Sequence, residues 1–585
     1  MILEESLMNT ATEEKIAKVI SVLPNKIKIE VSNIMEFKQN CERFTVGSYL
    51  RVSDHEDCAL ICIIENFSIE KDENTGERYI LEAVPLGFLD SEENFTRGGN
   101  NIAIPPTGVE LAKKDEIQNI YTSLDQDKQF CFSMLAQDTS IQVPVNGDKF
   151  FNKHLAVVGS TGSGKSHTVA KLIQEATSLK ATGYSGLNNS HIVIFDIHSE
   201  YQRAFPSANY INVEELILPY WLMSGEELEE LFVESSESQS YNQSSLLRRL
   251  ITRNKQKTNA AENITFDTPV KFSIEEVLNC IINLSKETRS SDNAQTICLI
   301  DENKTFEDDE AKFDYYFQQI LDFKEVKRSS VNKGMYNDGT LEKFISRIKN
   351  KTSDKRLNFL LGEQVQSTSF EDTLKHLLGY KDNSNANVTI IDLSGVPFEV
   401  LSITVSLISR LLFEYGYYYK KHLELPEQVE KNLTPLLLVY EEAHKYVPKS
   451  QYAKYNSSRH SIERIAKEGR KYGVTAMIVS QRPSEISETI FSQCSNFVAM
   501  RLTNPEDQNY VKRLIPDALG PLTDSLPTLK EGQAILIGDS IIMPSLVQIN
   551  PCEPEPSSND IRYLEEWKKQ WHNVNFESLS SIWIK

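Results

Sequence analysis

No stretch of this sequence approaches the roughly 18 consecutive apolar residues that a membrane-spanning helix requires. Its opening residues, 1–6, are largely apolar and acidic, and no basic segment followed by an apolar stretch marks a signal peptide. Both absences predict a cytoplasmic protein that has no membrane partner.

Cysteine is also sparse, and its spacing excludes the usual cysteine chemistry. The eight cysteines include no C-x-x-C pair, and Cys58 and Cys62 are the closest two. Zinc sites and disulfide frameworks rest on closely spaced or paired cysteines, so we expect neither a structural metal nor disulfides. The remaining interpretation is that these thiols are buried and pack as small apolar side chains.

Positive charge is the third shortage. Lys and Arg number 62 against 83 Asp and Glu, which gives a formal net charge of −21. This balance excludes a simple basic protein that coats nucleic acid. It still allows a ring that carries Lys and Arg in its central channel and acidic residues outside.

The length of the chain is that of a multidomain globular protein. At 585 residues it should hold about three to four domains. Residues 1–100 carry short strand-like runs, at 26–31, 45–52, 59–64 and 79–84, and predict a small β-barrel. The Gly- and Pro-containing segment that follows predicts a linker, which we assign to residues 101–142.

Beyond the linker, Val- and Ile-rich runs alternate with helical patterns, as in a parallel sheet with crossover helices. The predicted central strands are 155–158, 192–195, 388–391, 436–439 and 475–479. We expect an α/β core over 143–213 and 386–550, interrupted by a helical insertion over 214–385. The tail, 551–585, carries Trp567, Trp571 and Trp583 and is expected to pack on a neighbouring element or subunit.

A phosphate-binding pattern lies between the first predicted core strand and a predicted helix. Residues 159–166, Gly-Ser-Thr-Gly-Ser-Gly-Lys-Ser, match G-x-x-x-x-G-K-[ST] in full. In this pattern backbone N–H groups surround phosphate oxygens, Lys165 reaches the β- and γ-phosphates, and Ser166 ligates Mg²⁺. The predicted nucleotide-binding residues are Gly159, Ser160, Thr161, Gly162, Ser163, Gly164, Lys165, Ser166 and His167.

A second predicted strand, 436–440, ends in the carboxylate pair Glu441 and Glu442. In P-loop ATPases one such carboxylate helps to hold hydrated Mg²⁺ and the other polarises the attacking water. We assign Glu441 to the metal and Glu442 to the water, which predicts hydrolysis of ATP. The alternative is an exposed acidic pair without a catalytic role.

Four more motifs make the pattern specific. They are Ile-Phe-Asp-Ile-His-Ser-Glu-Tyr at 194–201, Glu-Glu-Ala-His-Lys-Tyr-Val-Pro at 441–448, Glu-Gly-Arg-Lys-Tyr-Gly at 468–473 and Ser-Gln-Arg-Pro at 480–483. With the phosphate loop, and in this order, they resemble the HerA branch of the HerA/FtsK ATPases. The resemblance implies an α/β fold: a RecA-like P-loop ATPase core with an N-terminal small β-barrel, a helical insertion and a C-terminal tail.

The resemblance also implies a homohexameric ring that acts as a helicase or translocase. Such a ring binds ATP and Mg²⁺ at subunit interfaces and double-stranded DNA in its channel. An arginine of the next subunit then reaches the γ-phosphate. Arg470 is the first candidate and Arg464 the second, with surface salt bridges as the alternative for both. Members of the family work with a nuclease or a sirtuin-like NAD hydrolase, and bacterial members occur in antiviral defence systems.

The remaining motif residues have less specific assignments. Gln481 is placed to sense the γ-phosphate or orient water, with a buried structural amide as the alternative. Glu200 is placed to assist the water or the metal. Asp196 fits either chemistry or the holding of its loop. His198 and His444 fit structural roles, because neither belongs to a metal-ligand cluster.

One region reverses the acidic balance of the chain. Between Arg459 and Arg513, nine Lys or Arg stand against six Asp or Glu. This excess fits a channel surface that contacts DNA phosphates independently of sequence, and equally a nucleotide interface. A DNA translocase is the leading hypothesis. The alternatives are an ATP-regulated ring scaffold that activates a partner, and a secretion or conjugation motor.

Overall fold

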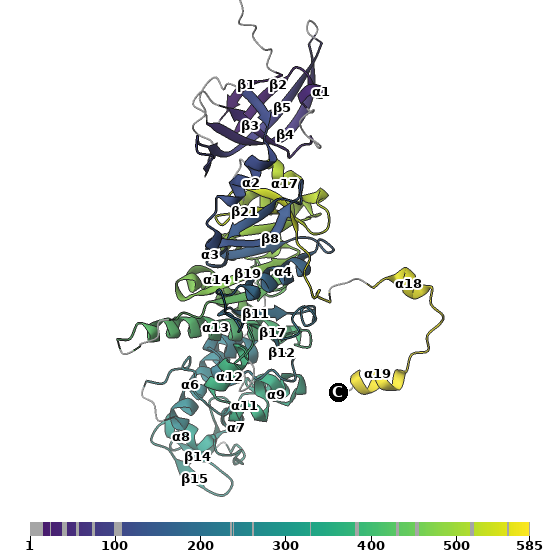
Figure 1. Cartoon of the computed structure of the whole chain (residues 1–585). Helices are drawn as coiled ribbons and strands as arrows, with labels where there is room; N and C mark the ends of the chain where they lie inside the picture. Colours follow the sequence, from purple (N-terminus) through teal and green to yellow (C-terminus); the bar gives the residue numbers. More distant parts are fainter. Residues whose placement is uncertain are drawn as a thin grey trace, which may run out of the picture.

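The computed structural model describes residues 16–23, 25–37, 44–53, 58–72, 76–98, 108–234, 237, 239–259, 263–327, 329–380, 385–426, 428, 432–450, 456–514, 520–557 and 561–583. A small antiparallel sheet, a central mixed sheet and a largely helical insertion follow one another along the molecule (Figure 1). The C-terminal tail extends to one side of them (Figure 1).

The N-terminal module is a curled antiparallel sheet. Its elements are β1 (Ala17–Leu23), β2 (Lys26–Val31), α1 (Ile34–Phe37), β3 (Tyr49–Ser53), β4 (Ala59–Asp72), β5 (Gly76–Leu89), β6 (Phe95–Arg97) and β7 (Gly108–Leu111). The strand order is β1-β2-β5-β4-β3-β7, with β6 paired to β5. Because β1 and β7 at the two ends lie against each other, the sheet forms a half-closed barrel.

Strand β4 shows how this module joins the rest of the molecule. Leu60 and Cys62 point into the barrel's own core. Ile61 and Ile63 point the other way and pack in the main core, which includes helix α2 (Lys114–Thr122). Successive strand residues face opposite sides, so the unbroken apolar run of β4 is buried on both faces.

The central sheet has eleven strands in the order β12-β17-β11-β18-β19-β10-β20-β21-β22-β8-β9. They are β8 (Gln129–Leu135), β9 (Gln142–Asn146), β10 (His154–Val158), β11 (His191–Asp196), β12 (Asn209–Ile211), β17 (Val388–Asp392), β18 (Leu436–Tyr440), β19 (Val474–Ser480), β20 (Cys494–Met500), β21 (Gln533–Gly538) and β22 (Ser545–Ile549). Pairing is parallel from β12 to β20 and antiparallel from there to β9. The predicted α/β class is therefore confirmed, and each of the five predicted central strands is present.

Helices accompany this sheet on the sequence segments that precede its first strand or connect its strands. They are α2, α3 (Gly147–Phe151), α4 (Lys165–Ser178), α13 (Phe398–Leu423), α14 (Ser457–Glu468), α15 (Glu488–Phe491), α16 (Pro505–Leu514) and α17 (Gly520–Asp524). Helix α13 buries most of its first half, where Val400 to Leu412 are nearly all apolar or small. Helix α14 packs along it.

The segment expected as a linker, 101–142, differs from that expectation over its described part. Residues 108–142 contain β7, α2 and β8, and β8 extends the central sheet by pairing with β22. The partner strand lies some four hundred residues later (Leu135 faces Val547), so no local pattern revealed the pairing. Residues 101–107 lie outside the described part.

The insertion is mostly helical, as predicted, but also holds a small sheet. Its helices are α5 (Gly225–Phe232), α6 (Ser240–Thr258), α7 (Ile274–Lys286), α8 (Asp309–Tyr316), α9 (Glu342–Ser353), α10 (Asn358–Leu361), α11 (Glu363–Ser367) and α12 (Phe370–Leu377). The unpredicted strands are β13 (Thr288–Ser290), β14 (Thr296–Cys298), β15 (Asn303–Thr305) and β16 (Val331–Lys333). Such short strands are too brief to show a two-residue alternation.

The tail carries α18 (Tyr563–Trp567) and α19 (Phe576–Trp583). Its Trp567, Trp571 and Trp583 are 74%, 92% and 90% exposed. They therefore do not pack on another element within the described part of the chain, and packing on a second subunit stays a prediction. Among the described residues, no helix is both long and apolar enough to cross a membrane.

Candidate nucleotide site

The phosphate loop connects the carboxyl end of β10 to the start of α4. Gly162 and Gly164 adopt φ of 69° and 95°, a left-handed region that favours glycine. Gly164 forms the N-cap of α4, so the loop wraps around the positive end of the helix dipole. Lys165 is the first residue of α4 and is only 7% exposed. This is the geometry that a phosphate group requires.

Two segments far along the chain hold the loop in place. The N–H of Ser160 donates to the carbonyl oxygen of Arg501 (2.7 Å), and Arg501 Nη2 donates to the carbonyl oxygen of Gly162 (3.0 Å). The N–H of Gly532 donates to the carbonyl oxygen of Ser163 (3.0 Å). The strands after the predicted motifs therefore fix the shape of the loop from behind.

Glu441, at the end of β18, is buried with 2% exposure. Its Oε2 accepts a hydrogen bond of 2.8 Å from the hydroxyl of Tyr201. Burial, and secondarily the charge of Glu442, raises the pKa of Glu441 to about 8. A carboxyl with so little solvation gains most when a cation is bound beside it, which suits the assigned metal role.

The backbone of Glu442 has a positive φ of 47°, whereas strand residues have negative φ. This left-handed conformation is uncommon for a residue with a side chain and marks a constrained position. Its Oε1 lies 4.0 Å from Lys165 Nζ and accepts a 2.5 Å hydrogen bond from Gln481 Nε2. Its Oε2 lies 3.2 Å from His444 Nδ1 without hydrogen-bond geometry.

Gln481 links the two halves of the site. While its amide nitrogen donates to Glu442, its oxygen accepts a 2.6 Å hydrogen bond from the hydroxyl of Thr161 in the phosphate loop. A displacement of the loop by a γ-phosphate would thus reach Glu442 through one side chain. The geometry suits the sensing or water-orienting role assigned to Gln481.

Glu200 accepts a 2.6 Å hydrogen bond from the hydroxyl of Ser166. The predicted Mg²⁺ ligand Ser166 thus has a carboxylate as neighbour, which suits the assistance expected of Glu200. Asp196 is fully buried and accepts from the N–H groups of His198 (3.2 Å) and Tyr201 (2.9 Å). Of its two proposed roles, the structure shows Asp196 holding the loop.

The two arginine candidates lie away from this chain's own phosphate loop. Arg464 sits over the ring of Phe413, 4.6 Å from its centroid, with Nε 4.0 Å from Glu468. Arg470 lines a cleft of about 630 Å³ and acts electrostatically on His154 at the amino end of β10. The phosphate loop follows the other end of β10, about 16 Å away at 3.3 Å per residue.

The residues present fit a Mg²⁺–nucleotide. A glycine-lined loop, a buried lysine and a serine hydroxyl meet three carboxylates there, and Ser163 Oγ is a buried polar atom with no hydrogen-bond partner among the described residues. When bound, Mg²⁺ would neutralise phosphate charge. Sequence reasoning missed Tyr201, Tyr446 and Arg501. The first two end or lie within quoted motifs, whereas Arg501 has no motif and only follows an apolar run.

Several known proteins are similar to this chain in sequence. A family model described as the central domain of helicase HerA matches residues 130–412. A probable helicase of Methanocaldococcus jannaschii is 23% identical over 551 residues, 90% of this chain and 91% of that protein. The DNA double-strand break repair helicase HerA of Sulfurisphaera tokodaii is 25% identical over 469 residues, 80% of this chain and 78% of that protein.

Two solved structures are also similar at low identity. VirB4 of Thermoanaerobacter pseudethanolicus has a TM-score of 0.46 at 12% identity, over 73% of this chain and 98% of that one. The plasmid coupling protein TrwB in complex with ADP and Mg²⁺ has a TM-score of 0.43 at 14% identity, over 76% of this chain and 94% of that one.

A phosphate loop after a central parallel strand, with a carboxylate pair after a strand next but one to it, defines a P-loop ATPase. The family model and the relatives carry the identification one step further. Over residues 130–412 the chain is similar to the helicase HerA family.

Proposed function

We propose that this chain is an ATP-driven translocase that forms a homohexameric ring around double-stranded DNA. The position of Arg470 carries the proposal. Among the described residues, its side chain makes no hydrogen bond or ion pair, and it lies at the end of β10 remote from its own phosphate loop. An arginine so placed can meet a γ-phosphate only in the site of a second copy.

Contact with DNA is supported by charge and by the relatives. The Lys and Arg residues between 459 and 513 lie on α14 and α16, in the turn that follows α14, and just past the ends of β19 and β20. The Sulfurisphaera relative is a DNA repair helicase by name. We infer sequence-independent contact with DNA phosphates, whose strength should fall steeply with salt.

The partner is proposed on the family resemblance. A nuclease or a sirtuin-like NAD hydrolase would carry out cleavage in an antiphage or DNA-processing system. The exposed tryptophans of the tail offer apolar surface for such a protein. A ring scaffold that activates its partner with little DNA movement is the second candidate, which the net charge of −21 favours.

Steady-state ATP hydrolysis with and without long duplex DNA tests the proposal. We expect turnover to rise with DNA and to vanish in Lys165→Ala, which loses the phosphate contact, and in Glu442→Gln, which loses the base that polarises water. Glu442→Gln should still bind nucleotide, since its P-loop is intact.

DNA-independent turnover in the wild type would contradict the translocase and favour the scaffold. Addition of a co-purified effector then separates the two candidates further. A motor that engages DNA only with its partner would regain DNA stimulation, whereas a scaffold would raise the effector's activity with unchanged ATP turnover.

A further inference from the structure

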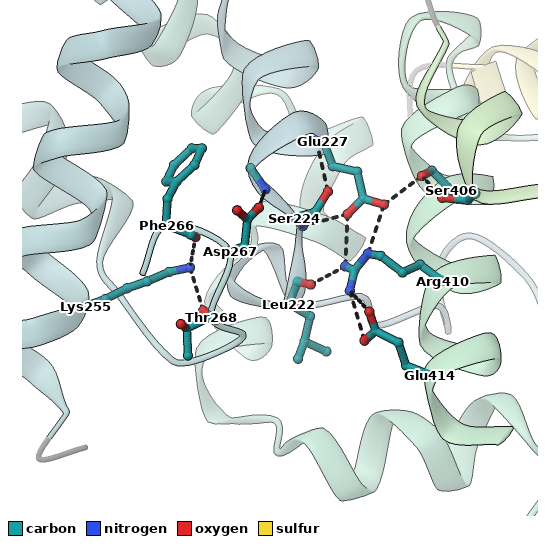
Figure 2. Close-up of polar contacts among 12 residues, drawn as sticks. Leu222, Ser224, Glu227, Lys255, Phe266, Asp267, Thr268, Ser406, Arg410 and Glu414 are labelled. Atoms are coloured by element: carbon teal, nitrogen blue, oxygen red, sulfur yellow. Dashed lines mark hydrogen bonds and ion pairs between the residues drawn. The ribbon is translucent and has the colours of Figure 1, made fainter. Parts of the chain in front are cut away.

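Helix α5 is the first α-helix of the insertion and contacts both α13 and α14 of the ATPase core. Its N-terminus is closed by a capping box of Ser224 and Glu227. The N–H of Gly225 in addition donates to Asp267 of the loop that Lys255 holds (2.7 Å). Figure 2 shows this arrangement, with α13 contributing Ser406 and Arg410. The start of α5 is therefore fixed from both sides.

A buried ion pair attaches α5 to α13. Glu227 is 1% exposed and pairs with Arg410, whose Nη2 lies 3.0 Å from Glu227 Oε2 (Figure 2). The same guanidinium donates to the carbonyl oxygen of Leu222 (2.5 Å) and to Glu414 (3.3 Å). Ser406 donates to Glu227 Oε1 at 2.7 Å. With its donors used in several directions, Arg410 leaves α5 little freedom to slide on α13.

One turn further along α5, Glu230 attaches the same helix to the beginning of α14. Its Oε2 accepts from the N–H groups of Asn456 (3.2 Å) and Ser457 (3.0 Å). These are N–H groups of the first turn of α14, which have no partner within the helix. A carboxylate there satisfies them and interacts favourably with the helix dipole. Glu230 thus caps α14 from another segment of the chain.

The first turn of α14 is also hydrogen-bonded to the segment after β18, which carries the carboxylate pair. The hydroxyl of Ser458 donates to the carbonyl oxygen of Tyr446. The hydroxyl of Tyr446, which is buried, donates to the carbonyl oxygen of Glu441 (2.8 Å). Three successive contacts, through Glu230, Ser458 and Tyr446, therefore lead from the insertion to the backbone of the catalytic carboxylate pair.

We propose that Glu230 is a positioning residue for ATP hydrolysis, through which the insertion sets the placement of α14, Tyr446 and the carboxylate pair. The path lies within one subunit and concerns turnover without DNA. It rests on the ATPase activity and not on the translocase proposal. A force or partner acting on the insertion would reach the catalytic strand end by this route.

The test compares Glu230→Ala, Glu230→Gln and Glu229→Ala in basal ATP hydrolysis. Glu229 is the matched control, since it is on the same helix and bonds Arg248 within the insertion. We expect Glu230→Ala to lower kcat about tenfold with KM for ATP within about twofold, because small misplacement of catalytic groups costs turnover rather than binding. Glutamine keeps an acceptor oxygen, so Glu230→Gln should recover most of the turnover. Glu229→Ala should resemble the wild type.

Wild-type kcat in Glu230→Ala would overturn the proposal, as would equal losses in Glu230→Ala and Glu229→Ala. A second variant, Ser458→Ala, removes one hydroxyl from the middle of the path and guards against misfolding at position 230. Its kcat should fall, and Glu230→Ala combined with Ser458→Ala should be no slower than the slower single variant. Multiplied losses in the double variant would show two independent effects and overturn the path.

The DNA response is read in the same assays. Loss of DNA stimulation in the wild type would count against the translocase and leave the basal comparison intact. Unaltered basal kcat in the variants would count against Glu230 and leave the translocase intact.

Discussion

Lys255 is a fully buried lysine. Its ammonium group donates hydrogen bonds to two backbone carbonyl oxygens, those of Phe266 (2.6 Å) and Thr268 (2.7 Å) (Figure 2). Burial lowers the pKa of Lys255 to about 8, against the opposing charge of Asp267. A neutral amine retains two N–H groups, enough for both carbonyls. The loop that caps α5 can therefore stay bonded when this amine loses its proton.

The lowered pKa makes a stability prediction with a definite sign. Between pH about 8 and about 10.5 the unfolded chain binds more protons at Lys255 than the folded chain, so this residue's contribution to stability rises with pH, by up to about 1.4 kcal/mol per pH unit. The thermal midpoint of the wild type minus that of Lys255→Met should therefore increase between about pH 7.5 and about pH 9.5. Lys257→Met, a more exposed neighbour paired with Glu276, is the control and should show no such gain. If the difference in thermal midpoint between the wild type and Lys255→Met did not change with pH, the lowered pKa of Lys255 would be contradicted.

At the scale of residues, the sequence predicted the phosphate loop but not the residues that support it. The phosphate loop is local, because one turn and one helix start require glycines, a lysine and a serine in sequence. Tyr201 bonds Glu441 across 240 positions, and Arg501 bonds Gly162 across 339. Such contacts depend on strand order, which no single segment encodes.

At the scale of elements, the joint between the insertion and the core is an ion pair of low exposure. Removing one partner of such a pair leaves a buried charge, which costs about 3–5 kcal/mol. We therefore expect Arg410→Met to lower the thermal midpoint strongly, and Arg410→Met combined with Glu227→Gln to recover part of the loss. The control is Arg249→Met, which breaks exposed pairs with Asp309 and Glu310 and should cost no more than about 1 kcal/mol. Equal midpoints for Arg410→Met and Arg249→Met would refute this account.

Element prediction succeeded where a run was apolar and parallel, and failed where pairing was distant. All five predicted central strands exist because buried parallel strands are unbroken Val- and Ile-rich runs. Strands β20, β21 and β22 were not predicted, and β8 was assigned to a linker. Their burial depends on one another across the whole core, so each is ambiguous alone.

At the scale of the assembly, the proposed arginine contact between subunits can be tested by mixing inactive variants. Arg470→Ala keeps its own nucleotide site, and Glu442→Gln keeps its arginine. In randomly mixed rings about a quarter of the interfaces would pair an intact site with an intact arginine, so activity should return to roughly that fraction. A mixture of Lys165→Ala and Glu442→Gln is the control, because both changes lie in one site. It should stay inactive, and an equally inactive Arg470→Ala mixture would contradict the contact.

The pairing of β8 with β22 determines where this chain can be truncated. The first antiparallel strand of the ATPase sheet precedes the phosphate loop, while the strand it bonds closes the sheet just before the tail. The hydroxyl of Tyr121 on α2 also meets Ser545 of β22 at 2.6 Å. A fragment that starts at residue 143 would lack β8 and leave the edge of β22 unpaired, and an unpaired strand edge promotes aggregation. A soluble ATPase fragment has to begin upstream of α2. Because the two ends of that fragment lie side by side, the fragment is suited to circular permutation.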